Sequence, residues 1–347
     1  MSNGIARRLV FSMLRNIKSN LIRWFGPFGI YQCARLMTRS HPRILMYHRF
    51  SNYSHDGRLG ASQFERQISI LKRDFNIIPL SELVKAFKDK SPLTKNSIVI
   101  TIDDGYLDFY QYAYPILKKY NVPATLYVTS GFVDRLLWLW PDRVTFIIAK
   151  TVCDTYSFPF HSEASQRIYN PSIEKPYGDL WNDVVQYCLS VSDIEKNIFL
   201  EKFANDLGVF VPSVPIDDYS AVTWDQLREM NDNGIDIGAH SITHPAMSKV
   251  ATENLYIEIA DCKTRIESEL GHDVSNFCYP NGQPADYNSS VISAVKNAGF
   301  KSATVAYVDN NPFCSLFELR RHSVGDGMFH FYKVIYGVEA LGRKLLK

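Results

Sequence analysis

Residues 98–105 read Ile-Val-Ile-Thr-Ile-Asp-Asp-Gly, an apolar, β-branched run that ends in two adjacent carboxylates and a glycine. Residues 235–245 read Ile-Asp-Ile-Gly-Ala-His-Ser-Ile-Thr-His-Pro, a second apolar run that ends in two histidines four residues apart. Both runs are typical of buried strands. Two imidazoles and one carboxylate suit a zinc ion with positions left for water and substrate, and the spare carboxylate suits a general base. The two runs together predict metal-assisted hydrolysis.

Each motif taken alone also has an ordinary structural explanation. Aspartate and glycine favour turns, so Asp103-Asp104-Gly105 also suits a type I turn. His240 and His244 could be two loop histidines without a metal. The functional interpretation therefore depends on the two motifs occurring together.

Apolar strands alternate with helices along most of the chain, which predicts an α/β fold with a parallel sheet and helices outside it. The polar clusters follow the strands, at the edge where α/β barrels build their sites. The alternation lapses between residues 138 and 219, which we interpret as a largely helical insertion into the barrel. Its aromatic residues could stack on sugars or simply form a core; they are Trp138, Trp140, Phe158, Phe160, Tyr169 and Tyr177.

The N-terminal region is strongly basic. The first 55 residues contain nine lysines and arginines and no aspartate or glutamate. We divide the chain into a basic arm at 1–40 and a barrel domain at 41–347. Residues 5–25 read as an amphipathic helix, which could lie on an anionic membrane surface or dock on the core with its basic face in solvent. A transit peptide is a further alternative.

The six cysteines are dispersed without a Cys-x-x-Cys pair, which favours free thiols in a reducing compartment. Charged residues interrupt the N-terminal apolar positions before they reach the length of a secretory signal. No segment has the 18–20 or so apolar residues of a membrane span. We therefore expect a cytoplasmic protein, with peripheral association at the inner face of the membrane if the arm binds lipid. The net charge of +2 gives no reason to expect a nucleic-acid partner.

Four segments carry a resemblance to a known family. They are Ile-Leu-Met-Tyr-His at 44–48, Thr-Ile-Asp-Asp-Gly-Tyr at 101–106, His-Ser-Ile-Thr-His-Pro at 240–245 and Phe-Cys-Tyr-Pro-Asn-Gly at 277–282. In these segments the chain resembles the polysaccharide deacetylases with NodB homology, carbohydrate esterase family 4. The resemblance implies a distorted (β/α) barrel of about seven parallel strands.

The resemblance also implies roles for individual residues. Asp104, His240 and His244 would ligate zinc or a similar divalent ion. Asp103 would be the general base that deprotonates a water molecule. The backbone N–H of Asn281 would help to hold the oxyanion of the tetrahedral intermediate.

Two departures from the family pattern leave roles open. Cys278 stands where many family members have an arginine that orients the base, and Arg320 or Arg321 could supply that charge instead. The family's general acid is usually a histidine in a late Leu-x-His motif, but this chain has Leu-Arg-Arg-His at 319–322. The candidates for the acid are therefore His322 and His48.

These features predict a metal-dependent hydrolase that removes an N-acetyl group from an amino sugar. The expected substrate is a glycan or a nucleotide-linked or lipid-linked precursor of a surface polysaccharide. The alternatives are a non-catalytic carbohydrate-binding or assembly protein on the same barrel, or another metal-dependent amide hydrolase.

Overall fold

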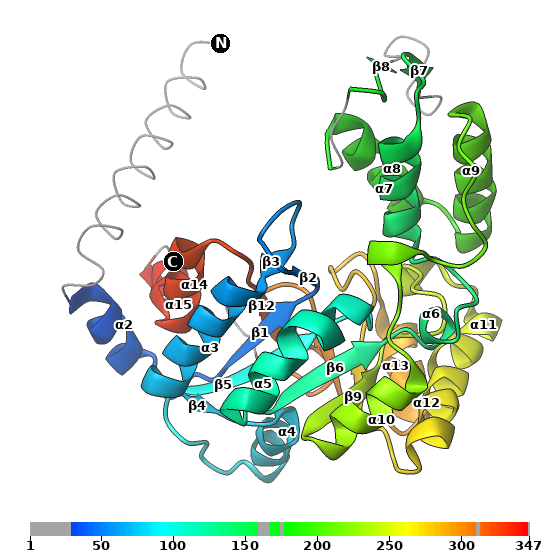
Figure 1. Ribbon diagram of the computed structural model, residues 1–347. Helices are drawn as coiled ribbons and strands as arrows, with labels where there is room; N and C mark the ends of the chain where they lie inside the picture. Colours follow the sequence, from blue (N-terminus) through cyan, green and yellow to red (C-terminus); the bar gives the residue numbers. More distant parts are fainter. Residues whose placement is uncertain (1–28, 159–166, 174–176, 310–312, 346–347) are drawn as a thin grey trace, which may run out of the picture.

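The computed structural model describes residues 29–158, 167–173, 177–309 and 313–345 (Figure 1). Within these residues, seven parallel strands close into a barrel because the last strand pairs with the first. A short strand, β4 (Asn76–Ile77), pairs with the start of β5 as an eighth. Around the barrel the strands are β1 (Arg43–Tyr47), β5 (Ser97–Ile102), β6 (Ala124–Val128), β9 (Ile235–Ala239), β10 (Asn276–Cys278), β11 (Ser302–Val305) and β12 (Leu319–Ser323). The predicted α/β barrel of about seven parallel strands is confirmed.

Helices cover the outside of the barrel, as the strand–helix alternation predicts. Pro115, which has no N–H to donate, lies at the start of α5, and a π-helical turn, η2, directly precedes it. The helical segments are α2 (Tyr31–Met37), α3 (Ala61–Asp74), α4 (Leu80–Asp89), η2 (Phe109–Ala113), α5 (Tyr114–Tyr120), α6 (Ser130–Val133), α10 (Trp224–Asp232), η5 (Met247–Lys249), α11 (Thr252–Tyr256), η6 (Ile257–Asp261), α12 (Cys262–Leu270), α13 (Ser289–Asn297), α14 (Met328–Ile335) and α15 (Val338–Leu345). A two-stranded sheet of β2 (Phe50–Ser51) and β3 (Leu59–Gly60) follows β1.

The alternation of side chains along each strand separates an outer core from the barrel interior. Ile98, Ile100 and Ile102 of β5 belong to the main hydrophobic core, which the helices cover. Val99, between them, belongs instead to a smaller cluster inside the barrel. Since successive side chains point to opposite faces, Asp103 continues the inward-facing series of β5. The first carboxylate of the motif is therefore inside the barrel.

The described residues between 138 and 219 form a separate lobe, shown in green at the upper right of Figure 1. The lobe consists of α7 (Trp140–Lys150), β7 (Tyr156–Ser157), β8 (Ile168–Tyr169), α8 (Asp179–Ser190), α9 (Asp193–Asp206) and η4 (Asp217–Tyr219). Its helices pack around their own hydrophobic cluster, which includes Val144, Leu180 and Phe203. The aromatic side chains of Trp140, Phe158 and Tyr169 are part of that cluster. We refer to residues 138–219 as the insertion.

The described part of the N-terminal arm lies against the C-terminal helices. Tyr31 of α2 stacks on Tyr332 and Tyr336, with ring centroids 5.5 and 5.2 Å apart. The helix predicted at 5–25, and with it the predicted membrane contact, lies outside the described residues. Among the residues that the structure describes, no helix is long and apolar enough to cross a membrane. The cytoplasmic location stays a prediction.

Close packing in the barrel interior predicts a large effect of a small change. Gly238 of β9 lies opposite Tyr127, and a Cβ atom there would lie 2.5 Å from Cδ1 of the Tyr127 ring. We expect Gly238→Ala to lower the free energy of unfolding by about 1–3 kcal/mol, because neither the ring nor the strand can move freely. Gly325→Ala is the matched control, since a Cβ atom at that position meets nothing within 4 Å. Equal midpoints for both variants in urea unfolding would contradict this packing argument.

Candidate active site

A cavity of about 230 Å³ lies where the barrel strands end. Six of the seven candidate residues from the sequence line it. They are His48, Asp103, Asp104, His240, His244 and Asn281. The seventh, His322, is not among the residues that line the cavity. The barrel thus brings together side chains that are separated by up to 233 positions in the sequence.

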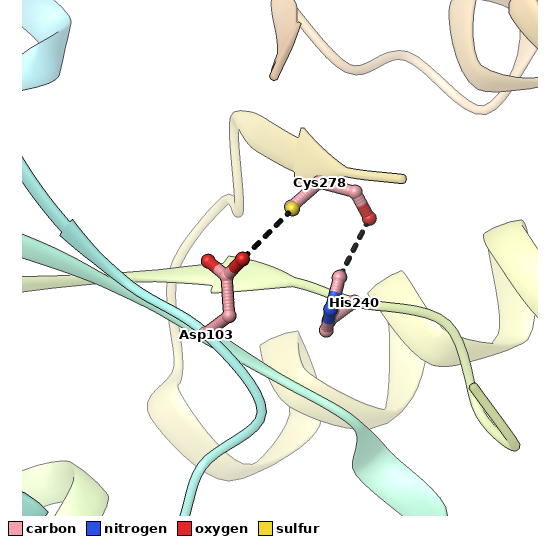
Figure 2. A group of neighbouring side chains, drawn as sticks. All are labelled: Asp103, His240 and Cys278. Atoms are coloured by element: carbon pink, nitrogen blue, oxygen red, sulfur yellow. Dashed lines mark hydrogen bonds between the residues drawn. The ribbon is translucent and has the colours of Figure 1, made fainter. Parts of the chain in front are cut away.

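Asp104, His240 and His244 form a compact buried group that fits a divalent cation. Oδ1 of Asp104 lies 3.3 Å from Nε2 of His240 and 3.4 Å from Nε2 of His244. Within the described residues, this buried oxygen has no hydrogen-bond partner. Nδ1 of His240 lies 2.8 Å from the carbonyl oxygen of Cys278 (Figure 2), a contact that orients Nε2 toward Asp104. A backbone carbonyl bound to the far nitrogen is the usual support for a metal-binding histidine.

Left-handed backbone at two of these three residues directs their side chains into the group. Asp104 has φ 82° and His244 has φ 58°, conformations that non-glycine residues rarely adopt. The loop after β9 is held by Glu258 of η6, whose carboxylate accepts hydrogen bonds from the N–H groups of Ile242 and Thr243 at 2.9 and 3.0 Å. Such strain persists where the surroundings impose it, as they commonly do at functional sites. Glu258 is a positioning residue that the sequence motifs did not reveal.

The electrostatics favour the metal-binding forms of Asp104 and His244, whereas they favour the protonated form of His240. Burial would raise the pKa of Asp104, but the imidazoles of His240 and His244 beside its carboxylate hold the pKa well below its usual value. Burial lowers the pKa of His244, which favours the neutral imidazole that coordinates metals. For His240, burial is outweighed by Cys278 and Asp104, which raise its pKa well above the usual value. Metal binding at His240 would therefore release a proton.

Asp103 is held by a buried, two-pronged ion pair with Arg321 of β12. Nη1 of Arg321 lies 2.6 Å from Oδ1 of Asp103, and Nη2 lies 2.7 Å from Oδ2. The guanidinium is completely buried, and it also donates to Thr101 and to the carbonyl of Val305. Burial would raise the pKa of Asp103, but Arg321 lowers it below its usual value. Asp103 is therefore an ionised carboxylate at neutral pH.

The same contacts decide between Arg320 and Arg321 as the partner of Asp103. Arg320 pairs with Asp309 at 3.1 Å. Nη2 of Arg321 lies 3.0 Å from Sγ of Cys278, so the guanidinium occupies space next to the small residue that replaces the family's arginine. The charge therefore comes from β12, which is separated from β10 in the barrel by β11.

A second group of potential ligands, Asp103, His240 and Cys278, is drawn in Figure 2. Sγ of Cys278 lies 3.7 Å from Oδ2 of Asp103. The guanidinium of Arg321 already contacts both of these atoms, and a cation there would face its positive charge. Nε2 of His240 faces Asp104 instead. The Asp104 group is therefore the better metal site.

The two histidines considered as general acid lie in different places. Nε2 of His48 is 3.6 Å from Oδ2 of Asp103, and its side chain is 43% exposed and lines the cavity. His322 follows the inward-facing Arg321 on the same strand and therefore points outward, where its Nδ1 lies 4.0 Å from Glu339 of α15. The expectation for His322 as an acid in this cavity does not fit the geometry. His48 is the candidate that does.

Asn281 and one aromatic residue complete the comparison with the sequence. Asn281 lines the cavity in the left-handed conformation, with φ 58°, three residues after the end of β10. Among the aromatic residues considered for sugar contact, Tyr177 lines the cavity, and Phe160 lies outside the described residues. Arg49, Tyr106 and Asp142 also line it and were not predicted. Arg49 and Tyr106 directly follow His48 and the Asp-Asp-Gly motif, which was the available signal.

Comparison with known proteins identifies the family. A family model for polysaccharide deacetylases matches residues 90–167 and 199–303, more than half of the chain. The chain belongs to the polysaccharide deacetylase family. The resemblance drawn from the sequence motifs is therefore confirmed.

Two curated relatives match parts of this deacetylase-family chain. YxkH of Bacillus subtilis, named after the same family, is 22% identical over 260 residues, which are 74% of this chain and 62% of that protein. A poly-β-1,6-N-acetyl-D-glucosamine N-deacetylase of Staphylococcus aureus is 42% identical over 85 residues, 24% of this chain and 28% of that protein. The matches therefore span less than two thirds of either relative.

Solved structures with low sequence identity share the fold. IcaB from Ammonifex degensii has a TM-score of 0.56 and 15% identity, covering 85% of this chain and 97% of that chain. The Streptococcus pyogenes deacetylase PplD, in complex with acetate, has a TM-score of 0.54 and 17% identity, covering 87% of this chain and 96% of that chain. The NodB-type barrel is thus shared over most of this chain.

The Asp104 group predicts metal binding that depends on a single histidine. We expect His244→Ala to abolish stoichiometric binding of a divalent ion while the fold is kept, because one of three ligands is lost. The metal content of the purified protein, measured by mass spectrometry, checks this. His272→Ala, an exposed histidine outside the cavity, is the control and should keep its metal. Unchanged metal content in the His244 variant would remove the site.

Proposed function

We propose that this member of the polysaccharide deacetylase family is a metal-dependent hydrolase that removes the N-acetyl group from an amino sugar. The observation that carries the proposal is the placement of the Arg321-held carboxylate of Asp103 beside the buried Asp104, His240 and His244. Two imidazoles and a carboxylate favour Zn²⁺. A divalent ion bound there would supply Lewis-acid polarisation of the amide carbonyl and would acidify water.

The chain's own residues supply the proton transfers. Asp103, kept ionised by Arg321, accepts a proton from the water that attacks the amide carbon. His48 lies next to Asp103 and is open to the cavity, so it can donate a proton to the departing amine. The backbone N–H of Asn281, at the end of β10, would stabilise the negative charge that develops on the carbonyl oxygen.

The substrate that we propose is an N-acetylated glycan, or a nucleotide-linked or lipid-linked precursor of a surface polysaccharide. The S. aureus relative is named as a deacetylase of poly-β-1,6-N-acetyl-D-glucosamine, which makes β-1,6-linked N-acetylglucosamine oligomers the first substrate to test. Release of acetate from such oligomers by the metal-loaded protein tests the proposal. Failure to release acetate from them and from N-acetylated sugar nucleotides would favour the binding-protein alternative.

The role of Asp103 predicts a loss of turnover without a loss of metal. We expect Asp103→Asn to slow acetate release by about 10²–10⁴-fold, because a carboxamide cannot accept the proton of water. The metal content should stay at the wild-type level, since Asp103 is outside the Asp104 group. Near-normal acetate release by a folded Asp103→Asn protein would show that another group is the base.

The ion pair predicts a shift in the pH dependence of the reaction. Arg321 lowers the pKa of Asp103 against the effect of burial, so Arg321→Gln should raise it. Asp103 would then become protonated at a higher pH than in the wild type. The acid limb of the plot of rate against pH should therefore shift to higher pH. Arg320→Gln, whose partner is Asp309, should leave the limb in place. Identical acid limbs in the wild type and the Arg321 variant would contradict the assignment.

A further inference from the structure

The insertion provides one wall of the catalytic cavity. Leu139, Pro141, Asp142 and Tyr177 line the cavity together with the residues at the barrel edge. Pro141 and Asp142 belong to the first turn of α7, and Tyr177 precedes α8. A molecule that enters the cavity therefore contacts the insertion on one side and Asp104, His240 and His244 on the other.

A buried charged cluster fixes this wall to the barrel. Arg49 lies between two carboxylates: its Nε is 2.7 Å from Oδ2 of Asp108, and its Nη1 is 3.4 Å from Oδ1 of Asp142. The guanidinium also stacks on the ring of Tyr106, 3.7 Å from the centroid, and donates to the backbone carbonyl of Asp218. The hydroxyl of Tyr106 donates to Oδ2 of Asp142 at 2.7 Å. Asp142 is thereby held in one position.

The two carboxylates beside Arg49 differ in one respect. Asp142 lines the cavity, whereas Asp108 is not among its lining residues. Among the described residues, each oxygen of Asp142 has one donor, and a carboxylate oxygen can accept two hydrogen bonds. Burial raises the pKa of Asp142 to about 6, so the group is mainly ionised at neutral pH. Asp142 can therefore accept a further hydrogen bond from a molecule in the cavity.

The size and lining of the cavity suit one sugar residue. Its volume of about 230 Å³ is below the roughly 300–1,000 Å³ of sites that enclose drug-sized ligands. Tyr177, 44% exposed, is one of the lining residues, and its ring packs edge-on against Trp181, with centroids 5.0 Å apart. An aromatic ring and a carboxylate provide an apolar face and a hydrogen-bond acceptor, which match the two kinds of surface on a pyranose ring.

We propose that the insertion is the sugar-recognition wall of the site, where Asp142 accepts a hydrogen bond from a hydroxyl of one N-acetylated hexosamine residue and Tyr177 packs on its ring. This inference rests on the proposed function, because it assigns the substrate of that reaction to this wall. Asp142 and Tyr177 are then specificity-determining residues contributed by the insertion and not by the barrel.

The test is the affinity of the full-length, metal-loaded protein for N-acetylglucosamine, measured by saturation-transfer NMR. This measurement needs no turnover. We expect Asp142→Asn to weaken binding by about tenfold or more, since hydrogen bonds to a charged group are among the stronger ones. Asp108→Asn is the matched control, because it removes the same charge from the other side of Arg49 without changing the cavity lining. Its affinity should fall by clearly less than that of Asp142→Asn, because Arg49 keeps its contacts with Asp142, Tyr106 and the carbonyl of Asp218.

Equal weakening in the two aspartate variants would overturn the inference, because Asp142 would then act only by holding Arg49. Wild-type affinity in Asp142→Asn would overturn it as well. For the ring, Tyr177→Ala should weaken binding by about 3–10-fold and Tyr177→Phe should restore it. Tyr256→Ala, an exposed tyrosine of α11 away from the cavity, should have no effect.

The outcome for the wild type separates this inference from the proposed function. If the wild type does not bind N-acetylglucosamine but releases acetate from the oligomers, the insertion does not recognise a single sugar residue as proposed. The deacetylase assignment then still stands. If it binds the sugar through Asp142 and Tyr177 but releases no acetate from any substrate, the wall is supported and the hydrolase assignment fails.

Discussion

The buried ion pair between Arg321 and Asp103 is the contact on which the rest of the site depends. Its partners are 218 residues apart in the sequence and meet because β12 pairs with β1 and closes the barrel. Loss of one partner of such a pair commonly costs about 3–5 kcal/mol, because the other charge stays buried and uncompensated. Barrel closure and an ionised base are therefore coupled. The small side chain of Cys278 is compatible with this arrangement, because the guanidinium lies against its sulfur.

The barrel and the insertion contribute different residues to the site. In the proposed function, the barrel supplies the base and the metal ligands from the carboxyl ends of β5 and β9, together with the loop held by Glu258. The insertion supplies one wall through Asp142, which Arg49 and Tyr106 attach to the barrel. Chemistry and substrate selection are thus assigned to different parts of the chain.

The strands and the grouping of Asp104, His240 and His244 could be predicted from the sequence because each follows from a local pattern. Apolar runs mark the strands, and Asp104, His240 and His244 directly follow two of them. Whether Arg320 or Arg321 pairs with Asp103 could not be predicted. Side chains alternate between the inside and the outside of the barrel along β12, and pairing with β1, where Ile44 lies opposite Arg321, decides which of the two points inward. The phase that turns Arg321 inward turns His322 outward. Asp142 had no local signal, since its contact with Arg49 spans 93 residues.

Diffraction from crystals of the zinc-loaded protein, with anomalous data at the zinc edge, tests the central claim most directly. The account predicts one strong peak about 2.0–2.2 Å from side-chain atoms of Asp104, His240 and His244, with Arg321 still paired to Asp103. A peak about 2.3 Å from the sulfur of Cys278, with the guanidinium of Arg321 displaced from Asp103, would contradict it.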